Sequence, residues 1–236
     1  MTMKAVRFTV PGAPPIVENV PIPQPGPGQV VVKIGGAGVC HSDLHVLDHG
    51  APGFHGPFTL GHENAGWVAS LGAGVTGWKL GDPVAVYGFW GCGHCHACLL
   101  SMESYCENAE HLSNNGGGIG TDGGMAEYML VPSPRLLVPL GSLAPRDAAP
   151  LTDAALTPYH AIKRGLHLLT PDATAVVIGV GGLGHMAVQL LRVLCGARVV
   201  AVDVDDRKLD HARQLGADLV VNSRNAAEAA ETINAF

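Results

Sequence analysis

A glycine-rich hexapeptide, set between an apolar run and a helical stretch, constrains the fold of this chain more than any other feature. The run 175–178 is apolar throughout, which is typical of a strand covered on both faces. Gly179-Val180-Gly181-Gly182-Leu183-Gly184 follows it directly. The first glycine permits a tight turn, the second lets backbone approach a pyrophosphate, and the third lets a helix lie close to the strand. Because the first N–H groups of that helix favour anions, the segment predicts a βαβ unit that binds a dinucleotide.

A carboxylate at the end of the next predicted strand indicates which dinucleotide. The run 198–202 ends in Asp203, about 20 residues after the glycine motif. A carboxylate there can accept hydrogen bonds from the adenosine ribose hydroxyls and would repel a 2′-phosphate, so NAD is predicted over NADP. Asp205 and Asp206, which follow, are interpreted as a solvated face and a helix N-cap.

The spacing of proline and glycine divides the chain near residue 150. Before it, both residues are frequent and β-rich apolar runs are short, at 30–34, 67–70, 84–87 and 126–131. After it, we expect helices at 152–164, 183–194 and 206–215 and strands at 173–180 and 198–203. The predicted fold is α/β: an irregular β-rich domain over 1–150, then the first half of a Rossmann doubly wound parallel sheet over 151–236.

Composition argues against several classes of partner. With 47% hydrophobic and 14% charged residues, the chain can bury a substantial core. Its net charge of -6 comes without a basic run, so nucleic acid is not expected as a partner. The first ten residues lack the features of a signal peptide, and no stretch approaches the length of a membrane span. The six cysteines are then thiols or metal ligands, and we expect a cytoplasmic protein without a membrane partner.

Four of the cysteines, Cys92, Cys95, Cys98 and Cys106, are crowded into one segment. Four thiolates can close a tetrahedral shell around Zn²⁺, which is the pattern of a structural site. Two disulfides are the alternative, and a reducing compartment and the awkward spacing both disfavour them. His94 and His96 lie in the same loop, but a complete thiolate shell leaves them no vacancy, so we expect them to face solvent.

A second set of candidate ligands is dispersed along the chain. Cys40 could be a small buried apolar residue, His62 a hydrogen-bonded histidine, Glu63 a surface charge, and Asp153 an N-cap for the helix after it. From composition alone, those structural interpretations are favoured.

The order of these motifs resembles the zinc-containing medium-chain dehydrogenase/reductase, or alcohol dehydrogenase, family. Cys-His-Ser-Asp comes first, then Gly-His-Glu, the four cysteines, an acid about 50 residues further on, and a strand with its glycine motif. The resemblance implies a GroES-like catalytic domain in which Cys40, His62 and Asp153 bind a catalytic zinc, with Glu63 able to approach it. Asp43 would accept the free ring N–H of His62. Most members have cysteine where this chain has Asp153, and a subset of bacterial NAD-dependent secondary-alcohol dehydrogenases has the acid.

The resemblance also implies roles for residues that are inconspicuous by themselves. Ser42 would take the proton of the alcohol, and His45 would pass it to solvent through the cofactor ribose. His41 would contact the pyrophosphate, Thr157 the nicotinamide side, and Lys208 the adenosine ribose. Without the family, a polar loop is an equally good interpretation of Ser42 and His45.

The predicted activity is hydride transfer between a primary or secondary alcohol and NAD, which gives an aldehyde or ketone. Leu44, Phe54 and Trp90 are candidate walls of an apolar pocket for uncharged aliphatic or aromatic alcohols, although large apolar residues are usually core. The zinc-free quinone reductase branch is disfavoured because it lacks both ligand sets.

The chain is shorter than the members of the family that it resembles, which argues against full activity. Family members run on for roughly another hundred residues to complete a six-stranded nucleotide sheet, and full-length relatives are expected to be homodimers or tetramers. The sequence therefore predicts a C-terminally truncated enzyme whose strand before Gly179 is an uncovered apolar edge. Such a chain is expected to self-associate, to bind NAD weakly and to turn over little. The alternative function is a non-catalytic zinc-binding remnant or fragment.

Overall fold

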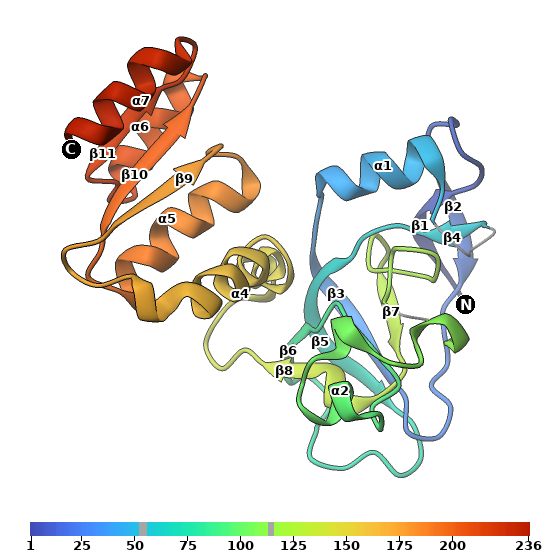
Figure 1. Cartoon of the computed structure of the whole chain (residues 1–236). Coiled ribbons are helices and arrows are strands. Elements are labelled where there is room, and N and C mark those ends of the chain that lie inside the picture. Colours follow the sequence, from blue (N-terminus) through green and yellow to red (C-terminus); the bar gives the residue numbers. More distant parts are fainter. Residues whose placement is uncertain (52–55, 113–115) are drawn as a thin grey trace. The chain divides into compact units, whose positions relative to one another are not determined.

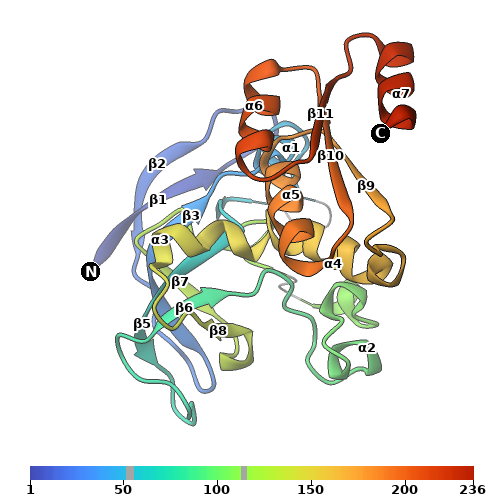
Figure 2. The same cartoon turned by 90° about the vertical axis from the view of Figure 1, so that its left-hand side faces the viewer.

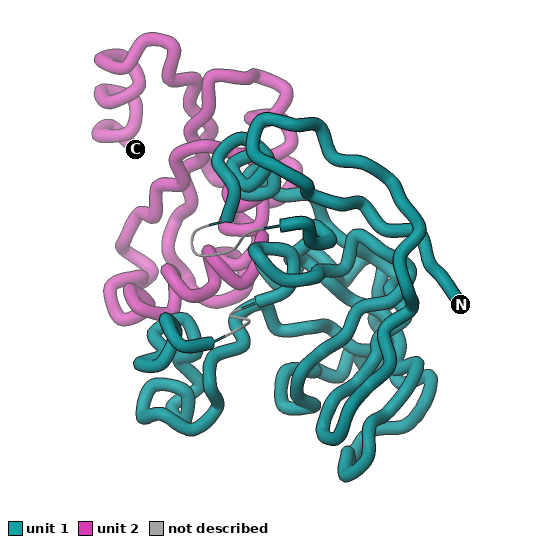
Figure 3. The backbone as a smooth tube through the Cα atoms, turned by 90° about the vertical axis from the view of Figure 1, so that its right-hand side faces the viewer, with its two compact units in different colours: residues 1–153 teal, residues 154–236 magenta. Residues whose placement is uncertain are grey.

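The computed structural model describes residues 1–51, 56–112 and 116–236 and divides into two compact units, Met1–Asp153 and Ala154–Phe236 (Figure 3). The boundary expected at residue 150 lies inside the short 3-10 helix η4 (Ala149–Thr152). Phe54, a predicted pocket residue, lies outside the described residues.

A five-stranded antiparallel sheet forms the centre of the first unit (Figure 1). Its order is β7 (Tyr128–Val131), β3 (Val30–Gly38), β5 (Glu63–Leu71), β6 (Pro83–Val86) and β8 (Leu137–Pro139). Valines of β3, β5 and β6 fill the core beneath it together with Met129 and Leu136, all at most 2% exposed. This burial explains why short valine runs separated by glycine and proline form strands here.

The long pairing of β3 with β5 brings two candidate ligand segments together. Gly38, at the end of β3, pairs with Glu63, at the start of β5. A Cβ on Gly38 would lie 1.8 Å from the Glu63 carboxylate, so only glycine permits this approach. Cys40 follows Gly38 by two residues, and His62 directly precedes Glu63. The register therefore places both residues where β3 ends and the neighbouring strand β5 begins.

A smaller sheet and short helices complete the first unit. The sheet has the order β2 (Ile16–Pro21), β1 (Thr2–Phe8), β4 (Phe58–Thr59), and Phe8 stacks on Phe58 with ring centroids 4.9 Å apart. Val46 of helix α1 (His41–His49) packs into the same cluster. The other helical segments of this unit are α2 (His96–Leu99), η1 (Glu103–Tyr105), η2 (Ala109–His111), η3 (Pro134–Leu136) and α3 (Pro145–Ala148).

The second unit is a three-stranded parallel sheet with helices on both faces (Figure 2). The strand order is β11 (Leu219–Asn222), β10 (Arg198–Asp203), β9 (Thr174–Ile178). Val199 and Ala201 pack under α4 (Leu156–Gly165), α5 (Gly182–Leu194) and α6 (Asp206–Gln214), while Val200 and Val202 pack under α7 (Ala226–Ala235). A short 3-10 helix, η5 (Leu166–Leu168), follows α4. The predicted α/β fold, a β-rich first part followed by a parallel sheet, is confirmed.

Strand β9 lies at the edge of this sheet. Its Val177 packs toward the helices, but Val176 is 40% and Ile178 is 83% exposed. The expectation of a strand covered on both faces is therefore wrong for the run 175–178, whereas the expectation of an apolar edge is correct for the part of the chain that the structure describes. No helix among the described residues is long and apolar enough to cross a membrane.

One predicted helix has different bounds. The helix expected at 152–164 is interrupted, because η4 ends at Thr152 and α4 begins at Leu156. Between them Asp153 adopts the non-helical angles φ -139° and ψ -63°. Asp153 therefore lies in the break between these two helices.

Candidate metal centres and nucleotide loop

Three predicted ligands meet in the first unit, from three separate segments. Cys40 is the N-cap of α1, His62 lies between β4 and β5, and Asp153 follows η4. One donor atom from each lies within 4.8 Å of the other two. Asp153 does not cap α4, whose N-cap is Ala155, so the interpretation of Asp153 as an N-cap is wrong.

His62 is held between two carboxylates. Its Nδ1 lies 3.3 Å from Oδ1 of Asp43, and its Nε2 lies 3.5 Å from Oδ2 of Asp153. Asp43 is 3% exposed, and its other oxygen accepts the backbone N–H of Cys40 at 2.9 Å in the capping box of α1. The same carboxylate thus begins the helix that carries Cys40 and lies within ion-pair distance of the imidazole.

The electrostatics of this set favour a bound cation. Burial lowers the pKa of His62, but Asp153, Asp43 and Cys40 outweigh it and raise the pKa to about 11. Neither ring nitrogen makes a well-formed hydrogen bond within the described residues, although both are buried. Two donors about 2.1 Å from one tetrahedral metal lie roughly 3.4 Å apart, close to the separation of His62 and Asp153. The donor set therefore fits a zinc ion.

A cavity of about 410 Å³ opens beside these donors. Ser42, His62 and Asp153 line it, and Oγ of Ser42 lies 3.7 Å from Sγ of Cys40. Its lining also includes Phe89, Glu103, Ser104, Ala109 and Ile119. The arrangement can hold a small molecule against a metal and a hydroxyl group.

Two of the predicted pocket residues lie elsewhere. Trp90 is 3% exposed, belongs to the core of the large sheet, and donates its Nε1–H to the carbonyl of Tyr87 at 3.0 Å. Trp90 does not line the cavity beside the donors; it lines a separate cavity of about 620 Å³, so its prediction as a wall of the substrate pocket is wrong for this site. Leu44 is 48% exposed on α1 and does not line the cavity.

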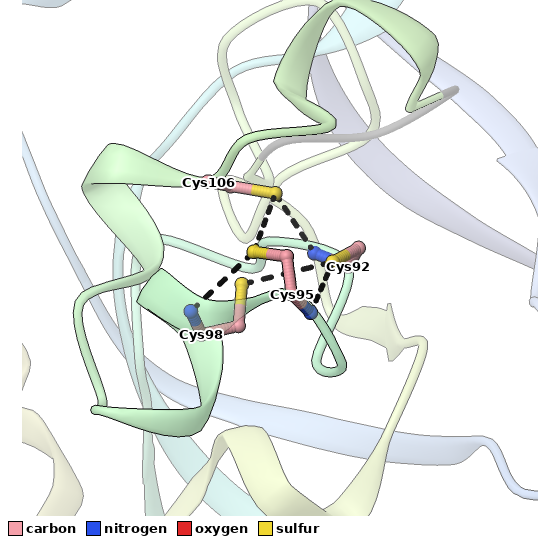
Figure 4. Close-up of side chains that lie close together, drawn as sticks. All are labelled: Cys92, Cys95, Cys98 and Cys106. Atoms are coloured by element: carbon pink, nitrogen blue, oxygen red, sulfur yellow. Dashed lines mark hydrogen bonds between the residues drawn. The ribbon is translucent and has the colours of Figure 1, made fainter.

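The four clustered cysteines converge in a loop around α2 (Figure 4). Sγ of Cys92 lies 3.9 Å from Sγ of Cys98, and Sγ of Cys95 lies 4.0 Å from Sγ of Cys106. Four sulfurs about 2.3 Å from one zinc in a tetrahedron are about 3.8 Å apart. All four are free thiols, and His94 and His96 are exposed outside the cluster.

Hydrogen bonds stabilise negative charge on this cluster. The side-chain N–H of Asn108 and backbone N–H groups lower the pKa of Cys92 to about 5. Burial and the neighbouring thiols raise the pKa of Cys98 to about 12. Four adjacent thiols can all ionise only around a cation, so the loop fits a structural zinc.

An arginine clamp that sequence reasoning missed holds this loop. Arg135 donates to the carbonyls of Trp90 and Gly91 on one side of the loop. On the other side it donates to Oε1 of Glu103 at 3.0 Å, and the Glu103 side chain is only 10% exposed. No local signal links Arg135 to a segment 32 residues earlier, so only the structure reveals this contact.

Three other predicted residues of the first unit lie on β5 and α1. Glu63 is 4% exposed and packs over Gly38, but it is not part of the three-donor group. His41 and His45 are exposed on α1, with ring centroids 5.3 Å apart.

The glycine motif forms the turn between β9 and α5. Gly179 has φ +87°, which favours glycine, and a Cβ on Gly184 would lie 1.8 Å from the carbonyl oxygen of Gly179. Around Gly181 and Gly182 no heavy atom lies within 4 Å of an added Cβ. Leu183, in the first turn of α5, is 42% exposed.

Asp203 is tied to this turn. It is 8% exposed, and its Oδ2 accepts the backbone N–H of Val180 at 2.7 Å. Its Oδ1 accepts the N–H groups of Val204 and Asp205 at 2.8 and 3.0 Å. Lys208 of α6 lies 3.8 Å from Oδ2, and Asp205 caps that helix. Thr157 lies in the first turn of α4.

Comparison with known proteins identifies the family. Residues 26–142 match the alcohol dehydrogenase GroES-like domain, and residues 182–236 match the zinc-binding dehydrogenase domain. An NAD-dependent alcohol dehydrogenase of Sulfurisphaera tokodaii is 40% identical over 94% of this chain and 64% of its own length. The chain belongs to the zinc-binding alcohol dehydrogenase family.

Two solved structures have the same architecture. The D-arabinose dehydrogenase of Sulfolobus solfataricus is 35% identical with a TM-score of 0.86, over 100% of this chain and 71% of that one. The acetophenone reductase of Geotrichum candidum, solved with NAD, is 35% identical with a TM-score of 0.83, over 93% and 63%. This chain spans about 64% of the length of the Sulfurisphaera tokodaii alcohol dehydrogenase.

Proposed function

We propose that this chain carries the catalytic machinery of a zinc-dependent alcohol dehydrogenase, which transfers hydride between a primary or secondary alcohol and NAD to give an aldehyde or ketone. The observation that carries the proposal is the convergence of Cys40, His62 and Asp153 beside a cavity, separate from the closed thiol set. Two anionic donors and one neutral donor would hold zinc with a position left open for substrate.

Zinc held by Cys40, His62 and Asp153 would supply Lewis acidity at the cavity. Oδ1 of Asp43 lies 3.3 Å from Nδ1 of His62, so this carboxylate would orient the ring once a metal is bound. Ser42, at the cavity wall, would accept the alcohol proton, and the exposed His45 would carry it to solvent. Glu63, buried next to His62, is proposed to approach the metal in some states.

The nucleotide in this proposal is NAD, bound at the turn between β9 and α5. The open space at Gly181 and Gly182 and the N-terminus of α5 suit a pyrophosphate, which His41 would also contact. Asp203 and Lys208 would contact the adenosine ribose, and Thr157 the nicotinamide side. Three hydrogen bonds do not exhaust the lone pairs of the Asp203 carboxylate, so a ribose hydroxyl can still donate to it.

The proposed substrates are uncharged aliphatic or aromatic alcohols, primary or secondary, and the matching aldehydes or ketones. Phe89 and Ile119 give the cavity an apolar wall, and the relative that reduces acetophenone has a fold with a TM-score of 0.83. Glu103, Ser104 and Thr152 give it polar groups as well, and another relative is a D-arabinose dehydrogenase. Substrate tests therefore include a simple alcohol and a sugar.

A cytoplasmic location belongs to the same proposal, supported by six cysteines that are all free thiols. Assembly into a dimer or tetramer is proposed only for the full-length relatives.

The test combines zinc analysis with NADH formation from 2-propanol, 1-butanol and D-arabinose. We expect two zinc ions per chain and weak NAD reduction with an alcohol, because the nucleotide sheet has only three strands in the part of the chain that the structure describes. Asp153→Ala should lose one zinc and the activity, whereas Asp147→Ala, an exposed acid on α3, should keep both. Two zinc ions without turnover would favour the non-catalytic zinc-binding alternative, and full metal content in Asp153→Ala would refute the ligand assignment.

A further inference from the structure

We propose that His41 and His45 form an additional site for one transition-metal cation, such as Ni²⁺ or Zn²⁺, on the exposed face of α1. The helix buries Asp43 and Val46 and exposes three histidines at four-residue intervals, His41, His45 and His49. The rings of His41 and His45 contact each other edge to face, with centroids 5.3 Å apart and planes at 82°.

The spacing makes the pair a chelate. Side chains at i and i+4 lie on one helix face with Cβ atoms roughly 5–6 Å apart, and two histidines at this spacing are a known zinc-binding arrangement. Imidazole nitrogens bind Zn²⁺, Ni²⁺ and Cu²⁺ through about 2.0–2.1 Å bonds. The helix backbone fixes both ligands in advance, so binding orders only two short side chains. The exposed carboxylate of Asp48, one turn after His45, adds negative charge to the same face.

The third histidine of α1, His49, is not part of the proposed site. His49 lies eight residues after His41, which is about 12 Å along the helix axis, so these two cannot share an ion. His49 is also exposed on α1 and lies at the same spacing from His45, but the ring contact joins His45 to His41. It therefore serves as a matched control within α1.

A cation at this site has a consequence that rests on the proposed function. The side chains of His41 and His45 that would hold it are those assigned above to the pyrophosphate and to proton transfer. A bound cation would reorient both rings and add positive charge to them, which interferes with proton transfer. We therefore expect zinc in excess of the two resident ions to inhibit the enzyme, and NAD to weaken binding of the added cation.

The binding test uses the untagged, zinc-replete full chain titrated with Ni²⁺ by calorimetry, with zinc release followed in parallel. We expect one Ni²⁺ per chain without loss of zinc. Loss of a metal's outer-shell partner alone costs 10–100-fold in affinity, so His41→Gln and His45→Gln should each weaken binding by at least about tenfold. His49→Gln and His167→Gln, an exposed histidine of η5, should bind as the unchanged chain does.

Unchanged binding in His45→Gln, or an equal loss in His49→Gln, would overturn the assignment. Gln is a good helix former, so these variants should keep α1, and far-UV circular dichroism checks it. No substrate or NAD is present in this titration. Its failure is therefore distinct from failure of the proposed dehydrogenase activity.

Discussion

Replacing Asp203 by Asn should destabilise the second unit, because this carboxylate joins the end of β10 to the glycine turn. Oδ1 accepts two backbone N–H groups, and Oδ2 accepts the N–H of Val180, which is 4% exposed. An Asn side chain can keep its oxygen toward Val204 and Asp205. Its NH₂ group must then face the N–H of Val180, so two donors oppose each other.

The magnitude follows from these bonds. A hydrogen bond to a charged group contributes about 1.5–3 kcal/mol, and bonds to an ionised acceptor are roughly twice as strong as neutral ones. Losing one such bond alone should reduce the free energy of unfolding by about 1.5–3 kcal/mol, and the weakening of the other two adds to this loss. A unit of this size has a total stability of about 4–12 kcal/mol, so the variant should still fold.

Urea unfolding can follow the two units separately. All three tryptophans, Trp67, Trp78 and Trp90, precede residue 154, so their fluorescence reports on the first unit. Helices α4 to α7 of the second unit dominate the far-UV circular dichroism. At roughly 1–2 kcal/mol per M of urea, the dichroism midpoint should fall by about 1–3 M, with little change in fluorescence. Asp210→Asn, an exposed acid on α6, is the control.

The effect should depend on pH. Burial raises the pKa of Asp203, but the N–H groups of Val180, Asp205 and Val204, together with Lys208, outweigh it and lower the pKa. Its stabilisation is therefore present above the unfolded pKa near ~3.9 and is lost as pH falls through the lower folded value. The difference between wild type and variant should close below about pH 4. An unchanged dichroism midpoint at neutral pH would refute the structural role of Asp203.

Three further changes test other contacts. Cys95→Ser should lose one of two zinc ions by elemental analysis, while Cys195→Ser, a thiol outside both sets, should keep both; two zinc ions in Cys95→Ser would contradict the structural site. Arg135→Met should speed zinc loss to a chelator by roughly tenfold or more, and Glu103→Gln, which keeps a hydrogen-bond acceptor, should speed it by a smaller factor. Zinc loss from Arg135→Met at the rate of the unchanged chain would show that Arg135 does not hold the loop. Ile178→Lys should reduce self-association in light scattering, and unchanged mass would show that the β9 edge is not the contact.

Local sequence was enough to predict the glycine turn and the thiol loop. The hexapeptide carries its own strand and helix, so the βαβ unit could be inferred without distant contacts. The four cysteines lie so close in sequence that any compact loop brings them together. Both features depend on short-range geometry, which sequence encodes directly.

The three-donor set could be predicted only through the family resemblance. Cys40, His62 and Asp153 are far apart in sequence, and the pairing of Gly38 with Glu63 that joins two of them depends on register shifts in β3. The sequence predicts Trp90 at the wrong cavity because a large apolar side chain carries no local signal of which cavity it lines. The Arg135 clamp has no periodicity or motif, so it stays invisible until the fold is known.

The arrangement of ligands along the chain also sets an order of metal loading during protein synthesis. The four cysteines are complete once Cys106 has emerged, whereas the second set must wait for Asp153. At a synthesis rate of about 5–20 residues per second, this delay lasts roughly 2–10 s. Closing a loop of about 15 residues also costs roughly 2 kcal/mol less than closing one of about 114. A nascent chain should therefore capture its first zinc in the cysteine loop, while Cys40 and His62 still lack their third partner.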